Sequence, residues 1–140
     1  MKAQLQKDAS ASNISLGIIY AANCVITPSN ETLQQKISQS IQAAKVRADG
    51  EELRGAVRNM LRVGAYKPTG RGKPASEYLL SAAKEEPERF PRINNLVDIN
   101  NLVSLESLLP ISVIDLARAG SYHFLARHGR AGCGQRAYPL

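Results

Sequence analysis

The feature that most constrains this chain is a run of polar side chains inside its most apolar stretch, residues 90–116. Five amides and acids fall there: Asn94, Asn95, Asp98, Asn100 and Asn101. Polar groups in apolar surroundings cost free energy unless they are hydrogen-bonded. These side chains therefore either hold a helix start and its loop in place, with Asp98 or Asn100 as the cap, or line a recess that binds a guest. We take the recess as the working hypothesis.

Apolar residues at helical spacing predict several helices. Residues 27–31 combine capping side chains with a proline and an acid, which is typical of a helix start. Leu33, Ile37, Ile41 and Ala44 follow on one face and predict a helix over residues 31–46. Similar patterns predict helices over residues 51–62, from residue 76 to Pro87, and around Leu102, Leu105 and Leu109.

One segment favours strands instead. Leu16, Ile18, Ile19, Val25 and Ile26 form short apolar stretches that contain β-branched residues. Such stretches are typical of strands or of a hairpin. We therefore expect β-structure over residues 15–26.

The composition indicates one folded domain and argues against metal chemistry. The chain has 140 residues, 44% of them hydrophobic and 21% charged, which is ordinary for a folded protein. It contains no apolar run of the ~20 residues that a membrane span requires and no secretion signal, so we expect a cytoplasmic protein without a membrane partner. Cys24 and Cys133 lie far apart, and His123 and His128 lie beside neither. We therefore expect reduced thiols, no metal site and no cofactor.

Positive charge is unevenly distributed. The net charge is +6, and cations far outnumber acids between Lys45 and Lys73. Arg54, Arg58 and Arg62 recur every four residues and so share one helix edge. Arg71 and Lys73 lie in a loop rich in glycine and proline that lacks the Gly-Lys-Ser/Thr order of a P-loop. These five cations are our candidate nucleic-acid surface; alternatively, the arginines cover the edge of the core with their heads in water.

The middle of the chain resembles a known family. Nine residues match its pattern without a gap: Ile93, Asn94, Asn95, Val97, Asp98, Asn101, Glu106, Pro110 and Asp115. The pattern is that of the B3/B4 domain of the bacterial phenylalanyl-tRNA synthetase β subunit. The sequence is still more similar to free-standing B3/B4-domain proteins, whose Arg-Pro-Ser-Ser-Glu-Ala-Leu stretch resembles residues 73–79 here. The match covers about residues 54–118.

The resemblance implies a fold and an activity. The fold is α+β, a three-layer (β/β/α) B3/B4-like sandwich that is helix-rich in this N-terminal portion, with residues 1–140 as a single domain. In the synthetase, this domain hydrolyses the ester of a mischarged aminoacyl-tRNA, which requires a positioned water and support for the oxyanion. By position, Asn101 and Ser112 are the candidate catalytic residues, and Asn100 and Glu106 are the candidate substrate-binding residues. The expected partner is tRNA or aminoacyl-tRNA.

Departures from the pattern keep a second function open. Ser112 stands where the family has its site histidine, and serine cannot act as an imidazole base. Leu102, Leu108, Leu109 and Ile114 replace Tyr, Gly, Gln and Phe, and we expect the C-terminal half of the family domain to be missing. The alternative is a non-catalytic module that binds tRNA or a small amino-acid-like ligand, or else a degenerate fragment without activity. No adenylate-forming or ATP-binding element is present, so the chain is not a complete synthetase.

Overall fold

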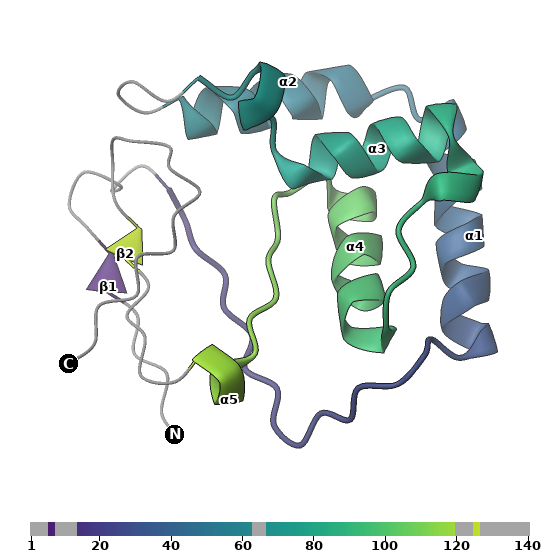
Figure 1. The fold of residues 1–140 in the computed structure, drawn as a ribbon. Coiled ribbons are helices and arrows are strands. Elements are labelled where there is room, and N and C mark those ends of the chain that lie inside the picture. The colour runs from purple at the N-terminus through teal and green to yellow at the C-terminus, as the bar shows by residue number, and fades with distance from the viewer. Residues whose placement is uncertain (1–5, 8–13, 63–66, 120–124, 127–140) are drawn as a thin grey trace.

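The computed structural model describes residues 6–7, 14–62, 67–119 and 125–126, which are mainly helical (Figure 1). The α-helices are α1 (Glu31–Val46), α2 (Gly50–Leu61), α3 (Ala75–Glu85), α4 (Asn95–Ser107) and α5 (Leu116–Ala119). Two short 3₁₀ turns are η2 (Gly70–Gly72) and η3 (Pro87–Arg89). The strands are β1 (Gln6–Lys7) and β2 (Leu125–Ala126), which pair in parallel with Gln6 opposite Leu125 and Lys7 opposite Ala126.

The predicted three-layer sandwich is wrong for the described part of the chain. Residues 14–62 and 67–119 contain no strand, and the two-residue pair β1–β2 cannot supply a sheet layer. The expected strands over residues 15–26 do not form either. A strand needs a neighbour for its backbone groups, and β propensity alone does not provide one. The repeating apolar pattern elsewhere in these residues has the period of a helix, and it is this pattern that the fold follows.

Helix α1 begins where its sequence predicts. The Asn30 side-chain oxygen accepts a hydrogen bond from the Leu33 amide at 2.9 Å and so caps the helix. Ile37, Ile41 and Ala44 are buried along one face, and Leu33 is half-buried. The predicted bounds, residues 31–46, are confirmed.

The core lies where α1, α3 and α4 meet. Figure 1 shows α1 and α4 side by side, with α3 lying across one end of the pair. Ten buried side chains form one apolar cluster: Ile37, Ile41, Ala44, Leu79, Leu80, Ala83, Phe90, Leu102, Leu105 and Leu108. The cluster draws on all three helices, so each helix buries its apolar face against the other two.

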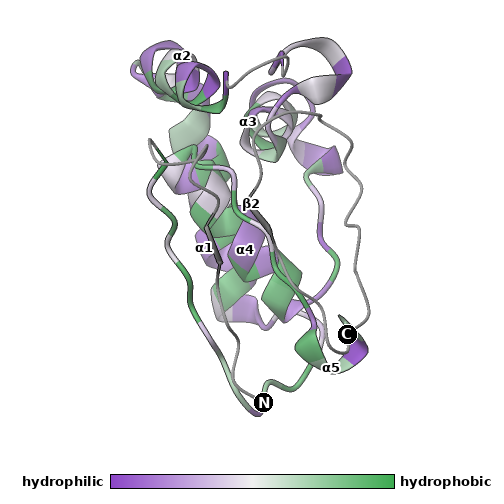
Figure 2. Ribbon diagram, turned by 90° about the vertical axis from the view of Figure 1, so that its left-hand side faces the viewer, coloured by the Kyte–Doolittle hydropathy of each residue, from purple (hydrophilic) through white to green (hydrophobic). Residues whose placement is uncertain are grey.

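Helix α2 lies beside α3, outside the main cluster (Figures 1 and 2). Its predicted bounds, residues 51–62, are one residue late at each end. Val57 is buried on its inner face, but Val57 is not part of the main cluster. The hollow between α2 and α3 measures only about 10 Å³ and is lined by Arg54, Val57, Ser76, Glu77, Leu80 and Leu108. That volume holds one water at most, so this hollow is too small for a ligand.

Candidate functional site

Two of the polar side chains at the middle of the sequence are used to start helix α4. The Asn94 side-chain oxygen accepts hydrogen bonds from the Leu96 and Val97 amides at 3.1 and 3.0 Å and is therefore the cap. Buried Asp98 accepts from the Ile93 amide at 2.8 Å through one carboxylate oxygen and from the Ser29 hydroxyl at 2.5 Å through the other. The sequence predicted Asp98 or Asn100 as the cap. Instead, Asn94 is the cap, and Asp98 in the first turn of the helix binds the backbone amide of Ile93, which precedes the cap.

Asn95 holds the chain that precedes α1 against α4. Its side-chain oxygen accepts from the Thr27 amide at 3.2 Å, and its side-chain nitrogen donates to the Val25 carbonyl at 2.9 Å. Its backbone amide also donates to the Thr27 carbonyl at 2.9 Å. Asn95 thus binds the backbone of Val25 and Thr27, which lie far away in the sequence, much as a neighbouring strand would.

None of the four residues of the predicted pocket lines the hollow between α2 and α3 or the hollow along α1. Half-buried Asn100 makes a long hydrogen bond of 3.4 Å to the Ile111 carbonyl. Asn101 is half-buried on α4 and makes no side-chain hydrogen bond to another described residue, and Ser112 is exposed in the segment after α4. Glu106 accepts from the Ser40 hydroxyl at 2.5 Å and so ties α4 to α1.

Two hollows in the described part of the chain are lined by other residues. The small one, between α2 and α3, has no contribution from the predicted pocket residues. A broad open hollow of about 500 Å³ runs along α1 and is lined by Glu31, Gln34, Gln35, Ser38, Gln39 and Arg92. Neither hollow includes Asn100, Asn101, Glu106 or Ser112. The recess hypothesis is therefore not supported. Of the five amides and acids on which it depends, four form hydrogen bonds with the protein's own backbone: Asn94, Asn95, Asp98 and Asn100.

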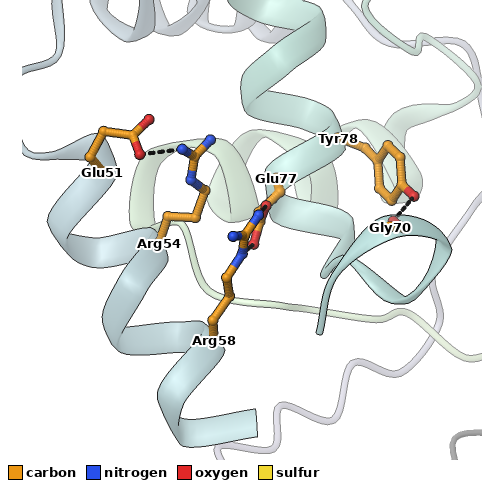
Figure 3. A network of polar contacts seen from close by, with 6 residues as sticks. All are labelled: Glu51, Arg54, Arg58, Gly70, Glu77 and Tyr78. Atoms are coloured by element: carbon orange, nitrogen blue, oxygen red, sulfur yellow. Dashed lines mark hydrogen bonds and ion pairs between the residues drawn. The ribbon is translucent and has the colours of Figure 1, made fainter. Parts of the chain in front are cut away.

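Two of the three arginines along one edge of α2 form ion pairs with glutamates (Figure 3). Arg58 donates from two nitrogens to the two carboxylate oxygens of Glu77 on α3, each at 2.6 Å. Glu77 is 6% exposed, so this two-pronged pair joins the helices in a nearly dry setting. The hydrogen bond to Glu77 raises the pKa of Arg58 above its usual range. Arg54 pairs with Glu51 one turn earlier on its own helix, and exposed Arg62 makes only a 3.4 Å contact to the Asn59 side chain.

Glu77 is a structural residue that the sequence did not identify, because a helix-start acid is most simply explained by the helix dipole. Arg47 is another. It donates to the Glu106 carbonyl at 2.6 Å and pairs with Asp49 at 2.6 Å, joining the end of α4 to the α1–α2 turn. The hydrogen bond from Arg47 lowers the pKa of Asp49 below its ordinary value. A pair that joins two helices leaves no periodic pattern in either of them.

The loop before α3 has a different character. We call residues 67–74 the η2 loop. Pro68 is fully buried and Pro74 is buried, so both ends are anchored. Its centre is held by Tyr78, whose hydroxyl donates to the Gly70 carbonyl at 3.2 Å (Figure 3). Gly70 has φ of 58°, a backbone conformation that favours glycine.

The η2 loop presents three cations to solvent. Lys67, Arg71 and Lys73 are exposed, and none of them forms an ion pair with a described residue. This sets them apart from Arg54 and Arg58, whose charges are already matched. Of the five cations predicted to bind nucleic acid, Arg62, Arg71 and Lys73 are exposed without an ion pair to a described residue, and only Arg71 and Lys73 share a loop, which Lys67 joins.

No other chemistry is evident in the described residues. Cys24 is exposed and has no disulfide, and no group of three or more potential metal ligands comes together among the described residues. Cys133, His123 and His128 lie outside the described residues. Among the helices that the structure describes, none is both long enough and apolar enough to cross a membrane.

Comparisons with protein-family models, with curated proteins and with solved structures give no match to this chain. We therefore infer function from the residues and their geometry.

Proposed function

We propose that this chain is a non-catalytic module that binds RNA through the η2 loop, and that tRNA is the class of RNA to test first. The observation that carries the proposal is that one short loop gathers three exposed cations, Lys67, Arg71 and Lys73, none of which pairs with an acid among the described residues. When such cations contact phosphates, the counterions condensed on the nucleic acid are released. This release is the main source of non-specific affinity for a nucleic acid.

The anchoring of the loop strengthens the proposal. Two buried prolines and the Tyr78–Gly70 hydrogen bond restrict the backbone from which the cations project. A surface that is ordered before binding loses less conformational entropy when it binds. By contrast, Arg58 would have to abandon the buried carboxylate of Glu77 before it could reach a phosphate. We therefore assign the loop, and not the edge of α2, to the RNA.

The choice of tRNA comes from the resemblance to B3/B4 domains. One backbone feature supports that resemblance: Leu108 ends α4 with φ of 57°, and the family pattern has glycine at this place. A left-handed residue at a helix end favours glycine, so the backbone here has the conformation for which the family residue is suited. A cytoplasmic location, where tRNA is found, belongs to the same proposal.

Geometry favours the non-catalytic alternative over aminoacyl-tRNA hydrolysis. An ester hydrolase needs a group that activates water and donors aimed at the oxyanion, within reach of the same atom. Asn101 and Ser112 line neither the hollow between α2 and α3 nor the one along α1, and exposed Ser112 makes no side-chain hydrogen bond to a described residue that could activate it. Binding does not need that assembly.

The test compares two variants of equal charge. In the first, Lys67, Arg71 and Lys73 are all changed to Ala; in the second, the exposed lysines Lys36, Lys45 and Lys84 are changed instead. Each variant loses three positive charges, but only the first alters the η2 loop. We expect tRNA binding, followed by fluorescence anisotropy, to weaken about tenfold or more in the loop variant and much less in the control. Equal losses in the two variants would mean that overall charge, and not this loop, attracts the RNA.

A further inference from the structure

Residues 15–22 form an apolar segment that the described fold leaves uncovered. The stretch from residue 9 to residue 30 contains no Asp, Glu, Lys, Arg or His. Six large side chains in it, Leu16, Ile18, Ile19, Tyr20, Val25 and Ile26, are each between 45% and 95% exposed. Single exposed apolar residues are common, but a continuous exposed group of this size indicates an interaction surface.

The backbone of residues 15–21 is also open, as far as the described part of the chain shows. Residues 15–22 run as an extended trace apart from the helices in Figure 1, and no hydrogen bond from another described residue reaches the backbone of residues 15–21. Asn23, with φ of 55°, ends the extended run. An extended segment with open amides and carbonyls is a template for pairing with another strand.

Charge identifies the partner that this segment suits. The protein carries a net charge of +6, and two copies repel each other wherever their cationic surfaces meet. Residues 9–30 carry none of that charge, so the same segments of two copies can approach without like-charge contact. Two identical strands can pair about a two-fold axis, which gives a closed dimer.

The exposed apolar area is sufficient for such a contact. The six side chains are about two thirds exposed on average, which leaves roughly 400 Å² of apolar surface at about 100 Å² for each large side chain. A standard interface covers about 800 Å² per partner, and a little over half of that is apolar. Four of these side chains lie in residues 15–22, and with Val25 and Ile26 just beyond them one copy supplies about the apolar surface that a standard interface uses.

We propose that residues 15–22 are a self-association site, at which two copies of this chain pair as antiparallel strands and cover each other's apolar side chains. The pairing satisfies the open backbone groups and buries the exposed side chains in one step. It does not involve the η2 loop, so it is independent of RNA binding.

The experiment measures the mass of the protein in solution by sedimentation equilibrium. We expect two copies per particle at roughly 100 µM, where a dimer with a dissociation constant of micromolar order is nearly complete. Ile19→Lys places a charge on the segment at a side chain that is 95% exposed, so it tests pairing without disturbing the core. We expect it to weaken the dimer about tenfold or more.

Two further variants make the outcome decisive. Val46→Lys adds the same charge at another highly exposed apolar residue, at the end of α1, and should leave the dimer unchanged. Ile19→Pro removes a backbone donor and should break the pairing as Ile19→Lys does. The proposal is overturned by a single-copy mass in the wild type, by equal loss in the Val46 variant, or by a dimer that persists in Ile19→Pro. Far-ultraviolet circular dichroism checks that each variant keeps its helices.

Discussion

The Arg58–Glu77 pair between α2 and α3 gives the sharpest stability prediction. Arg58→Met removes both hydrogen bonds to a carboxylate that is 6% exposed. Glu77 then remains buried without a charged partner, and losing one member of a buried pair typically costs about 3–5 kcal/mol. Because the Arg58 side chain is 26% exposed, water already screens the pair, and we expect about 2–3 kcal/mol of lost unfolding free energy, near the low end of that range.

The reverse change should cost less. In Glu77→Met the unpaired group is Arg58, whose partly exposed head can turn toward water. The double variant Arg58→Met/Glu77→Met leaves no unpaired charge at all. We therefore expect it to be more stable than Arg58→Met alone, because apolar residues of similar volume often replace a buried pair at little cost.

Urea unfolding followed by circular dichroism measures these differences directly. For a chain of this length, the Arg58→Met loss corresponds to a fall in Tm of roughly 8 °C. Arg54→Met is the matched control, because Arg54 lies on the same edge of α2 but pairs with exposed Glu51; its loss should stay below about 0.5 kcal/mol. The reasoning is refuted if the two arginine variants lose the same stability, or if the double variant is the least stable of the set.

Two other predictions concern the helix junctions. Asn95→Ala removes the side-chain hydrogen bonds to Val25 and Thr27. We expect it to lower the unfolding free energy by about 1–2 kcal/mol and to speed hydrogen exchange at the Thr27 amide. The control, Asn101→Ala, should change the unfolding free energy by less than about 0.5 kcal/mol, and equal losses would contradict the structural role of Asn95. The pKa of Asp49 is lowered by Arg47 in the folded state, so its stabilising contribution is complete above the ordinary value of 3.8 and is lost as pH falls through the lowered folded value. Asp49→Asn should therefore flatten the acid limb of the stability–pH curve, and an unchanged limb would show that this pair does not couple to folding.

Helix positions followed from the sequence, because apolar spacing and capping residues are local signals. The bounds of α1 are confirmed, and those of α2 differ by one residue at each end. The start of α4 was harder to predict, because five neighbouring amides and acids all have capping chemistry. Only the folded backbone shows that Asn94 caps the helix while Asn95 holds residues 25–27.

Long-range contacts did not follow from the sequence. Glu77 lies 19 residues from Arg58 on another helix, and no periodicity in either helix announces the pair. The strand prediction for residues 15–26 was wrong because β-branched residues favour a strand only where another strand lies alongside. The sequence also did not show which cations are paired: Arg54 and Arg58 pair with acids, whereas Arg62, Arg71 and Lys73 are exposed without an ion pair to a described residue.

The salt dependence of tRNA affinity tests whether the cations of the η2 loop contact phosphates. Three cations that each neutralise one phosphate predict that log K for tRNA falls with log salt concentration at a slope of roughly −2 to −3. The Lys67/Arg71/Lys73→Ala variant should bring that slope close to zero. A wild-type affinity that hardly changes with salt, or a loop variant that keeps the wild-type slope, would contradict RNA binding through the η2 loop.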